Sequence, residues 1–431
     1  MAKPLFSIVI PTYNRQDLVT YAIESVIRQT FDDYEIIVCD NFSTDNTAAV
    51  VAQFKDSRIK YIRTPQHFVI ADNWEYSRTQ AEGQLVLMLS DDDALVSTAL
   101  EHFYQEFKQH HSEFMFTNVA EYRDNTFLGP EQNILDCPPF SGSSRILQAE
   151  EIIKFLFSFA NMHYSYHPSA FIFSRTLANT VANRAGRFFQ TNGVEYFAWP
   201  VAAVLSNKIV YIDSPLVILG RTKKSWGVNL SLCNPGNKKI KKYTDDVEKR
   251  RKNSPVSNFT MCNLIAEGIL TAQKAFPKEF EKYIFDEAQF IIATMRELRD
   301  RKNLGVDVSE EMGEINQYLG QHPDLMAEIS RRKRLGGDEP QKTVWKTLRS
   351  LAGDLGLRRV RARIRNPRRV RERTIQDAQK VKQGEVKTGL RISGKDFGFH
   401  DIVGSAEFLA GIITENKTIE VRDGLGIDNS K

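Results

Sequence analysis

The sequence has few cysteines and no long apolar run. Its four cysteines, in a chain of 431 residues, are scattered without Cys-x-x-Cys spacing, which argues against a zinc site and a disulfide framework and fits a reducing compartment. The longest apolar candidate, residues 152–160, has about half of the ~20 residues that a bilayer-spanning helix needs. The N-terminus also lacks the apolar core of a signal peptide. We therefore expect a cytoplasmic protein, with peripheral attachment to the inner face of a membrane as an open alternative.

An excess of one charge and a dinucleotide-binding fingerprint are also missing. The 58 Lys and Arg residues nearly balance the 54 Asp and Glu residues, which gives a net charge of +4 with histidine neutral. No Gly-x-Gly-x-x-Gly follows the first predicted strand, and this argues against a dehydrogenase. The length and the 42% of hydrophobic residues instead suggest two or three globular domains.

Short apolar runs alternate with amphipathic helical patterns over the first 110 residues. Apolar residues recur at helical spacing between the runs, for example over residues 18–27. The predicted strands are residues 6–10, 35–40, 59–62 and 84–89. Continuous apolar strands separated by helices are typical of a parallel sheet covered on both faces. We therefore expect an α/β fold with a mainly parallel sheet flanked by helices.

The rest of the sequence divides into three parts. Residues 111–230 mix predicted strands and helices and extend the first unit. Residues 231–258 are polar and rich in Lys, Asn and Pro, as expected of a linker. Residues 259–431 have mainly helical patterns. The expected organisation is one domain over residues 1–230, with residues 1–110 as its first half, followed by the linker and a helical C-terminal region.

Three aspartates, Asp91–Asp93, directly follow the fourth predicted strand. Carboxylates about 4 Å apart repel by about 4 kcal/mol at the effective dielectric near a protein surface, so the cluster needs a cation or full solvation. Mg²⁺ and Mn²⁺ prefer carboxylate and phosphate oxygens, whereas a solvated loop or an acidic first helical turn is the alternative. Thr12 and Asp40 end two other predicted strands. Since the carboxyl ends of parallel strands share one edge, we expect all three groups to line one ligand crevice.

Three segments resemble, in order and spacing, the nucleotide-sugar-binding half of family-2 glycosyltransferases with the GT-A fold. They are SIVIPTYNR, YEIIVCDNFSTDNT and AEGQLVLMLSDDDALV. The resemblance is close from residue 5 to about residue 110 and extends more loosely to about residue 230. It implies a Rossmann-like GT-A sheet and a hexosyltransferase that moves a sugar from a nucleotide diphosphate-sugar to a hydroxyl acceptor. It also implies Mn²⁺ or Mg²⁺ as cofactor and a cell-envelope, polysaccharide or lipid-linked glycan as acceptor.

The resemblance further implies roles for individual residues. Asp92 would be the metal ligand that bridges the diphosphate, with Asp93 as a second carboxylate of the metal site. This chain has Ser90 where the commoner family pattern has an aspartate. The residues that the resemblance assigns to nucleotide-sugar binding are Pro11, Thr12, Tyr13, Arg15, Asp40, Asn41, Asn73 and Asp91.

The family also places a catalytic base in an acidic pair at the start of a helix downstream of the metal motif. The matching stretch here is TNGVEYFAWP, in which Glu195 is the candidate and Tyr196 stands at the second acidic position. An inverting transfer needs such a carboxylate to take the proton of the acceptor hydroxyl. An ordinary carboxylate in the first turn of a helix is the alternative.

Aromatic and imidazole side chains suggest where an acceptor binds. His163, Tyr164 and His167 precede a predicted strand in NMHYSYHPSA, and Trp226 lies in the basic stretch GRTKKSWG. These four residues are the acceptor-binding candidates, because aromatic faces and imidazoles are useful partners for sugars. Half-buried structural side chains and an exposed basic turn are the alternatives.

Residues 342–373 concentrate positive charge. They hold twelve Lys or Arg residues against two acidic ones, with Trp345 and several leucines interleaved. A basic amphipathic helix of this kind suits an anionic membrane surface, and nucleic acid is the rival partner. A solvated helix remains the third interpretation.

Three functions therefore remain in view. The first is a metal-dependent, inverting glycosyltransferase. The second is a non-catalytic module that binds a nucleotide-sugar, which Ser90 and Tyr196 permit. The third and least favoured is a nucleic-acid-binding protein, which depends on residues 342–373 alone.

Overall fold

Strand β1 (Phe6–Thr12) lies inside a sheet, with β2 (Tyr34–Asp40) on one side and β4 (Leu85–Met88) on the other. The computed structural model describes residues 3–127, 131–159, 165–225, 253–256, 260–303, 305–334 and 390–414. The candidates His163, Tyr164 and Trp226, the basic segment 342–373 and most of the expected linker lie outside the described residues.

The first half of the chain alternates strands and helices, as the sequence predicts. Strands β1 to β4 pair in parallel, and their order in the sheet is β4-β1-β2-β3. In the register of β1 and β2, Thr12 lies opposite Asp40, so both strands end at the same edge. The other elements of this half are α1 (Val19–Ile27), α2 (Thr47–Val51), β3 (Ile59–Arg63), α3 (Ile70–Thr79), β5 (Ala94–Leu95) and α4 (Ala99–His110).

The second half extends the same sheet with strands of both directions. Strand β9 (Phe171–Ser174) lies antiparallel between β4 and β6 (Phe114–Arg123), and β10 (Ile209–Arg221) runs parallel to β6. The further elements are β7 (Ile134–Cys137), β8 (Ser144–Leu147), α5 (Ala149–Phe157), the short 3₁₀ helix η1 (Pro168–Ala170), α6 (Arg175–Ala185) and α7 (Val194–Leu205). Within the described residues, the strands form one mixed sheet of eleven strands.

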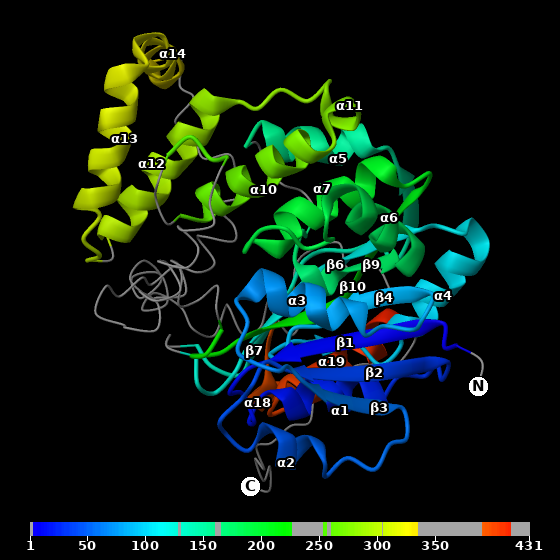
Figure 1. Ribbon diagram of the computed structural model, residues 1–431. Coiled ribbons are helices and arrows are strands. Elements are labelled where there is room, and N and C mark those ends of the chain that lie inside the picture. Colours follow the sequence, from blue (N-terminus) through cyan, green and yellow to red (C-terminus); the bar gives the residue numbers. More distant parts are fainter. Residues whose placement is uncertain are drawn as a thin grey trace, which may run out of the picture.

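Apolar side chains cover both faces of the sheet because successive residues of a buried strand point to opposite sides. Ile8 and Ile10 of β1 belong to a core cluster with residues of α1, α2 and α4, whereas Val9 belongs to a larger cluster with residues of α3, α5, α6 and α7. The continuous apolar runs of the sequence therefore mark strands between two layers of helices (Figure 1). The expected fold class, an α/β sheet flanked by helices and followed by a helical region, is confirmed. The sheet is mixed rather than mainly parallel, because β7, β8 and β9 pair antiparallel with their neighbours.

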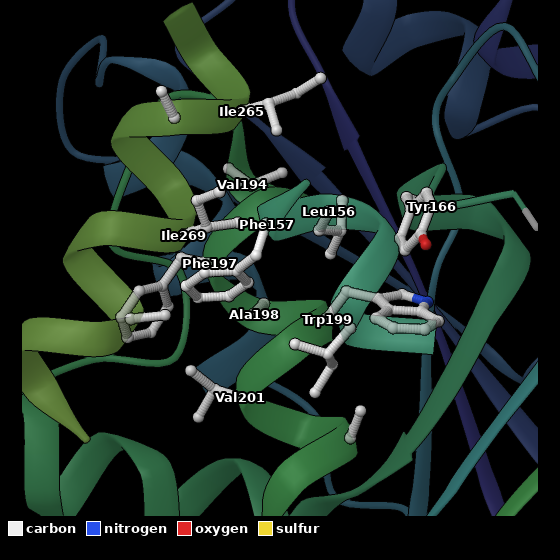
Figure 2. Close-up of a cluster of buried hydrophobic side chains, with 14 of the residues drawn as sticks. Leu156, Phe157, Tyr166, Val194, Phe197, Ala198, Trp199, Val201, Ile265 and Ile269 are labelled. Atoms are coloured by element: carbon white, nitrogen blue, oxygen red, sulfur yellow. The ribbon is translucent and has the colours of Figure 1, made fainter. Parts of the chain in front are cut away.

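The larger core continues into the helical region after residue 260. This region consists of α10 (Met261–Ala275), α11 (Pro277–Phe280), α12 (Glu287–Asn303), α13 (Ser309–Gln321) and α14 (Pro323–Arg334). Helix α10 packs on α5 and α7 through side chains that include Leu156, Phe157, Val194, Phe197, Ile265 and Ile269 (Figure 2). Glu297 of α12 accepts hydrogen bonds from the backbone N–H groups of Met261 and Cys262 and so caps the start of α10.

Residues 390–414, which we call the C-terminal return, lie against elements of both halves of the sheet domain. Strand β11 (Leu390–Ser393) pairs antiparallel with β7, and α18 (Gly394–Phe397) leads to α19 (Ile402–Thr414), which packs beside α1, β5 and β10 (Figure 1). Asn133 joins the two parts, because its side chain accepts a hydrogen bond from Tyr122 and donates one to the carbonyl of Phe399. The final described segment thus extends the sheet rather than the helical region. Among the described residues, no helix is long and apolar enough to cross a bilayer.

Candidate active site

Polar side chains from three strands meet at the carboxyl edge of the sheet. The hydroxyl of Thr12, at the end of β1, donates a hydrogen bond of 2.7 Å to Oδ2 of Asp91. Asp91 belongs to residues 90–93, which we call the acidic turn and which follow β4. Since Thr12 also lies opposite Asp40 at the end of β2, the structure brings the acidic turn and the ends of β1 and β2 to one edge, as the sequence reasoning expected.

Arg15 is the cation nearest to the acidic turn. Its Nη1 lies 2.8 Å from Oδ1 of Asp91 and 3.3 Å from Oδ2 of Asp92. Burial acts to lower the pKa of Arg15, but Asp91 and Asp92 raise it above its usual value. Arg15 was expected in a nucleotide pocket, and the structure places it in this ion pair.

Asp92 and Asp93 are held by β10 and by the turn that follows it. The backbone N–H of Gly220 donates to Oδ1 of Asp93 at 3.0 Å, and the Ser169 hydroxyl donates to Oδ2 at 2.6 Å. The Ser225 hydroxyl donates to Oδ2 of Asp92 at 2.8 Å. Both oxygens of the buried Asp93 thus accept hydrogen bonds from the protein, whereas Asp92 makes its contacts through Oδ2.

The packing between Gly220 and Asp92 leaves no room for a side chain. A Cβ on Gly220 would lie 1.8 Å from the carbonyl oxygen of Asp92. Residues 220–225, which we call the basic turn, can therefore lie against the acidic turn only because residue 220 is glycine.

Burial and mutual repulsion disfavour the ionised carboxylates of the acidic turn. Burial raises the pKa of Asp91 to about 6, although Arg15 opposes this shift. Burial, and then the charge of Asp92, raise the pKa of Asp93 well above its usual value. Arg221 lies close enough to act on Asp93 but is already hydrogen-bonded to Glu121. An additional cation at this place would stabilise the ionised carboxylates.

The residues of the acidic turn limit how a divalent cation could bind there. Among the described residues, no three His, Cys, Asp or Glu side chains converge into a metal-binding group. The place nevertheless already attracts a positive charge, because the Arg15 guanidinium lies beside Asp91 and Asp92. Mg²⁺ commonly takes one or two carboxylates and completes its coordination with substrate phosphates and water. The geometry therefore fits a cation held by Asp92, with the rest of its coordination supplied by water or by a phosphorylated ligand.

The candidate nucleotide-binding residues fall into two groups. Asp40 is 1% exposed, and its carboxylate accepts hydrogen bonds from Tyr61 and from the backbone N–H of Ser43. The amide of Asn41 both donates to and accepts from the backbone of Phe68. These two side chains shape the edge of the sheet, so their direct contact with a ligand is less favoured by the geometry than the sequence suggested.

Other candidates remain accessible or lack a partner. Tyr13 is 42% exposed, and its ring lies 4.3 Å from that of His67 between centroids. The two rings are tilted by 38° to each other and offer an aromatic surface two residues after the buried Pro11. Asn73 of α3 is buried, and its Oδ1 accepts no hydrogen bond from the described residues.

His167 is the one acceptor-binding candidate within the described residues. Its Nδ1 accepts a hydrogen bond from the backbone N–H of Ser169 and lies 3.5 Å from Oδ2 of Asp93. Burial and the charge of Arg221 lower the pKa of His167 to about 4, while a third of the side chain, 34%, remains exposed. A neutral ring that accepts through Nδ1 carries its proton on Nε2, where it can donate to a ligand.

Glu195 lies in the first turn of α7, after Gly193. Burial raises its pKa to about 7, which is close to the value that suits a general base at neutral pH. Within the described residues, no hydrogen bond or ion pair joins Glu195 to the acidic turn. Packing connects α7, which carries Glu195, to the neighbourhood of His167. The ring centroids of Trp199 in α7 and of Tyr166, the residue before His167, lie 4.6 Å apart (Figure 2).

The structure adds three residues that the sequence reasoning did not select, and it adds Arg221 from the basic stretch that the sequence had singled out. Ser169, Gly220, Ser225 and Arg221 surround the acidic turn. Only the basic stretch around Arg221 gave a signal in the sequence. Single serines and glycines are too common to be selected without knowledge of their spatial neighbours.

Comparison with known proteins identifies a related family. Residues 7–177 match the family model described as Glycosyl transferase family 2. The chain is 31% identical over 125 residues to UDP-Glc:alpha-D-GlcNAc-diphosphoundecaprenol beta-1,3-glucosyltransferase WfgD of Escherichia coli, covering 29% of this chain and 49% of that protein. It is 41% identical over 107 residues to GalNAc(5)-diNAcBac-PP-undecaprenol beta-1,3-glucosyltransferase of Campylobacter jejuni, covering 24% of this chain and 34% of that protein. This chain thus spans half or less of the length of these two relatives.

A solved structure shows a looser likeness. It is that of residues 1–349 of TarS of S. aureus in complex with UDP-GlcNAc, with 17% sequence identity and a TM-score of 0.46. The match covers 78% of this chain and 92% of that chain. A likeness at this level carries no argument about function.

Proposed function

Residues 7–177 are a family-2 glycosyltransferase domain, and on that premise we propose that the protein transfers a sugar from a nucleotide diphosphate-sugar to a hydroxyl acceptor. The proposed reaction depends on a divalent cation, Mn²⁺ or Mg²⁺, and inverts the configuration at the transferred sugar carbon. The proposed acceptor is a lipid-linked or cell-envelope glycan.

One observation carries this proposal, namely the meeting of Thr12, Arg15 and the acidic turn at the carboxyl edge of the sheet. Ligands of open α/β sheets bind outside the carboxyl ends of the strands. A carboxylate at that edge is the arrangement that a cation-bound diphosphate needs. The exposed pair of Tyr13 and His67 lies after β1 and β3 and offers a stacking surface for a nucleobase.

The protein's own residues have distinct parts in the proposed reaction. A divalent cation held by Asp92 would stabilise the negative charge of the departing nucleoside diphosphate. Thr12 and Arg15 fix Asp91, while Ser225 orients Asp92. His167 donates a hydrogen bond from Nε2 to the sugar or the acceptor.

Glu195 is the proposed general base. With a pKa of about 7, its carboxylate is partly ionised at neutral pH and can take the proton of the acceptor hydroxyl as the oxygen attacks the sugar. A single displacement by this route inverts the sugar carbon. The helical region supports the base, because α10 packs directly against the first turn of α7.

The relatives suggest the class of substrates. The name of the Escherichia coli relative gives UDP-Glc as donor and a diphosphoundecaprenol-linked sugar as acceptor, and the Campylobacter jejuni relative is named for an undecaprenol-linked acceptor. We propose a chemically similar pair for this protein. Peripheral contact of residues 342–373 with an anionic membrane would bring the enzyme to such an acceptor.

Thermal stabilisation by a panel of nucleotide-sugars, each with and without Mn²⁺, tests the proposal. A ligand that binds only the folded protein raises its unfolding temperature, so a true donor gives a Mn²⁺-dependent increase. The donor identified in this way should then release its nucleoside diphosphate in the presence of acceptor. Stabilisation without turnover, over a range of acceptors, would instead favour a non-catalytic binding module, and the absence of any stabilisation would contradict both.

A further inference from the structure

Arg15 lies against the carboxylate of Asp92, the residue to which the proposed divalent cation is assigned. Its Nη1 lies 2.8 Å from Oδ1 of Asp91 and 3.3 Å from Oδ2 of Asp92, so one guanidinium nitrogen forms ion pairs with both carboxylates. The side chain is 19% exposed, which leaves it a path to solvent. Without this cation, the two neighbouring carboxylates would repel each other.

The same guanidinium also holds the basic turn. Nη2 of Arg15 donates a hydrogen bond of 2.7 Å to the backbone carbonyl of Lys224. The turn is closed on itself, because the N–H of Lys224 donates to the hydroxyl of Thr222 and the N–H of Thr222 donates to that of Ser225. Ser225 in turn contacts Asp92. The carboxylate of Asp92 and the basic turn therefore share Arg15 as a common partner.

We propose that Arg15 is a built-in counter-ion that competes with the divalent cation for Asp92, so that cation binding also releases the basic turn from Arg15. The proposal rests on the proposed function at one point, the assignment of the cation to Asp92.

Charge and geometry support the competition. A divalent cation bound to Asp92 would lie within a few Å of the guanidinium that now contacts the same oxygen. Like charges at that separation repel strongly at the effective dielectric near a protein surface, so the cation displaces Arg15 from this position. When Arg15 moves, the carbonyl of Lys224 loses its donor, and the basic turn loses one of the contacts that fix it.

Release of the turn has a consequence for the donor. Lys223 and Lys224 are carried by the basic turn, and Lys224 is paired with Asp17 in this state. A turn freed from Arg15 could bring these ammonium groups to the phosphates of a cation-bound ligand, since phosphate oxygens attract both. The competition would thus couple arrival of the cation to rearrangement of the segment beside the site.

The test measures binding of Mn²⁺ alone, without nucleotide, by electron paramagnetic resonance of the free ion. We expect Arg15→Gln to bind Mn²⁺ about tenfold more tightly than the wild type, because the repelling charge is gone. Arg15→Lys keeps the charge and should bind as weakly as the wild type. Arg28→Gln is the matched control and should leave the affinity unchanged, because Arg28 follows α1 and pairs at the surface with Glu24 and Glu407.

The outcomes separate the proposal from the function on which it rests. Asp92→Asn should abolish Mn²⁺ binding in both the wild-type and the Arg15→Gln background. Equal affinity of Arg15→Gln and wild type, with binding still lost in Asp92→Asn, would overturn the competition and leave the cation assignment intact. Mn²⁺ binding that is unaffected by Asp92→Asn would overturn both.

A measurement on the wild-type chain covers the case in which Arg15→Gln does not fold. Backbone hydrogen exchange at residues 222–225 should become faster at saturating Mn²⁺, because the turn loses its hydrogen bond to Arg15. Unchanged or slower exchange at these residues, with Mn²⁺ bound, would overturn the proposal.

Discussion

The carbonyl oxygen of Asp92 lies 1.8 Å from the position that a Cβ on Gly220 would occupy. The acidic turn and the end of β10 are thus in direct backbone contact. Ile402 of the C-terminal return lies behind them, with its Cδ1 3.3 Å from the same position. Three segments that are far apart in the sequence therefore fix where Asp92 stands.

Gly220→Ala tests this contact. The added methyl group must displace the acidic turn, so we expect a loss of stability of about 1–3 kcal/mol and loss of Mn²⁺-dependent donor binding. Gly411→Ala in α19 is the control, because no atom lies within 4 Å of its new Cβ, and it should be as stable as the wild type or up to about 1 kcal/mol more stable. Chemical denaturation and calorimetry measure the two effects. Unchanged donor binding in Gly220→Ala would show that the position of the acidic turn is not critical.

Gly268→Ala tests the support of α7 by α10. A Cβ at this position would lie 2.5 Å from Cβ of Tyr196 and 2.7 Å from its carbonyl carbon, so the first turn of α7 must shift and carry Glu195 with it. Misplacement of a catalytic group by about 1 Å can cost up to about 10²-fold, and we expect kcat to fall while donor affinity is kept. Gly313→Ala, at an open helical position of α13, should change neither. A loss confined to donor affinity would contradict this role of α10.

Glu195→Gln tests the base through the dependence of rate on pH. A carboxylate accepts a proton only when it is ionised, so the wild-type kcat/KM should rise with pH and level off above about 7. The variant should lose this dependence and turn over about 10²–10⁴-fold more slowly with unchanged donor affinity. Glu150→Gln in the first turn of α5 is a matched control that should behave as the wild type. A wild-type profile in Glu195→Gln would remove the assignment.

The raised pKa of Glu195 also predicts how the stability of the protein depends on pH. The rate rises with pH, whereas the stability falls. Because burial raises its pKa from 4.5 to about 7, the folded protein keeps a proton that the unfolded chain gives up in that range, and stability from this group falls as the pH rises through it. Glu195→Gln should therefore be more stable than the wild type at pH 8 and equally stable below pH 4.5. Urea denaturation at the two pH values measures the difference. A variant that is less stable at pH 8 would contradict the raised pKa.

Ile392→Ala tests whether the C-terminal return belongs to the core of the sheet. Ile392 of β11 is fully buried, and its truncation should cost about 2–5 kcal/mol. Ile284→Ala, at a side chain that is 84% exposed, should stay within about 0.5 kcal/mol of the wild type. Equal stability of the two variants would mean that the return contributes little to the fold.

The fold was predictable where the pattern is local. Continuous apolar runs that end in polar residues located β1 to β4, and helical spacing located α1 and α7 within a few residues. The pairing of segments that are distant in the sequence was not predictable, because the periodicity of apolar residues carries no information about neighbours in space. The antiparallel β9 between β4 and β6, and the return of β11 to β7, are such cases.

The candidate site was likewise predictable only in part. The acidic turn was found because like charges directly after an apolar strand are costly and need a reason. The hydrogen bonds that fix it come from Ser169, Gly220 and Ser225, whose residue types are common and whose roles arise only from tertiary contacts. Asp40 was expected at a ligand, and each of its oxygens accepts a hydrogen bond within the protein, from Tyr61 and from the backbone N–H of Ser43.

Calorimetric titration of nucleoside diphosphates, UDP and GDP, into the wild type and Asp92→Asn, each with and without Mn²⁺, tests the central claim most directly. If Asp92 holds the cation that carries the diphosphate, Mn²⁺ strengthens binding to the wild type and has no effect on binding to Asp92→Asn. The same gain from Mn²⁺ in both proteins would contradict the account.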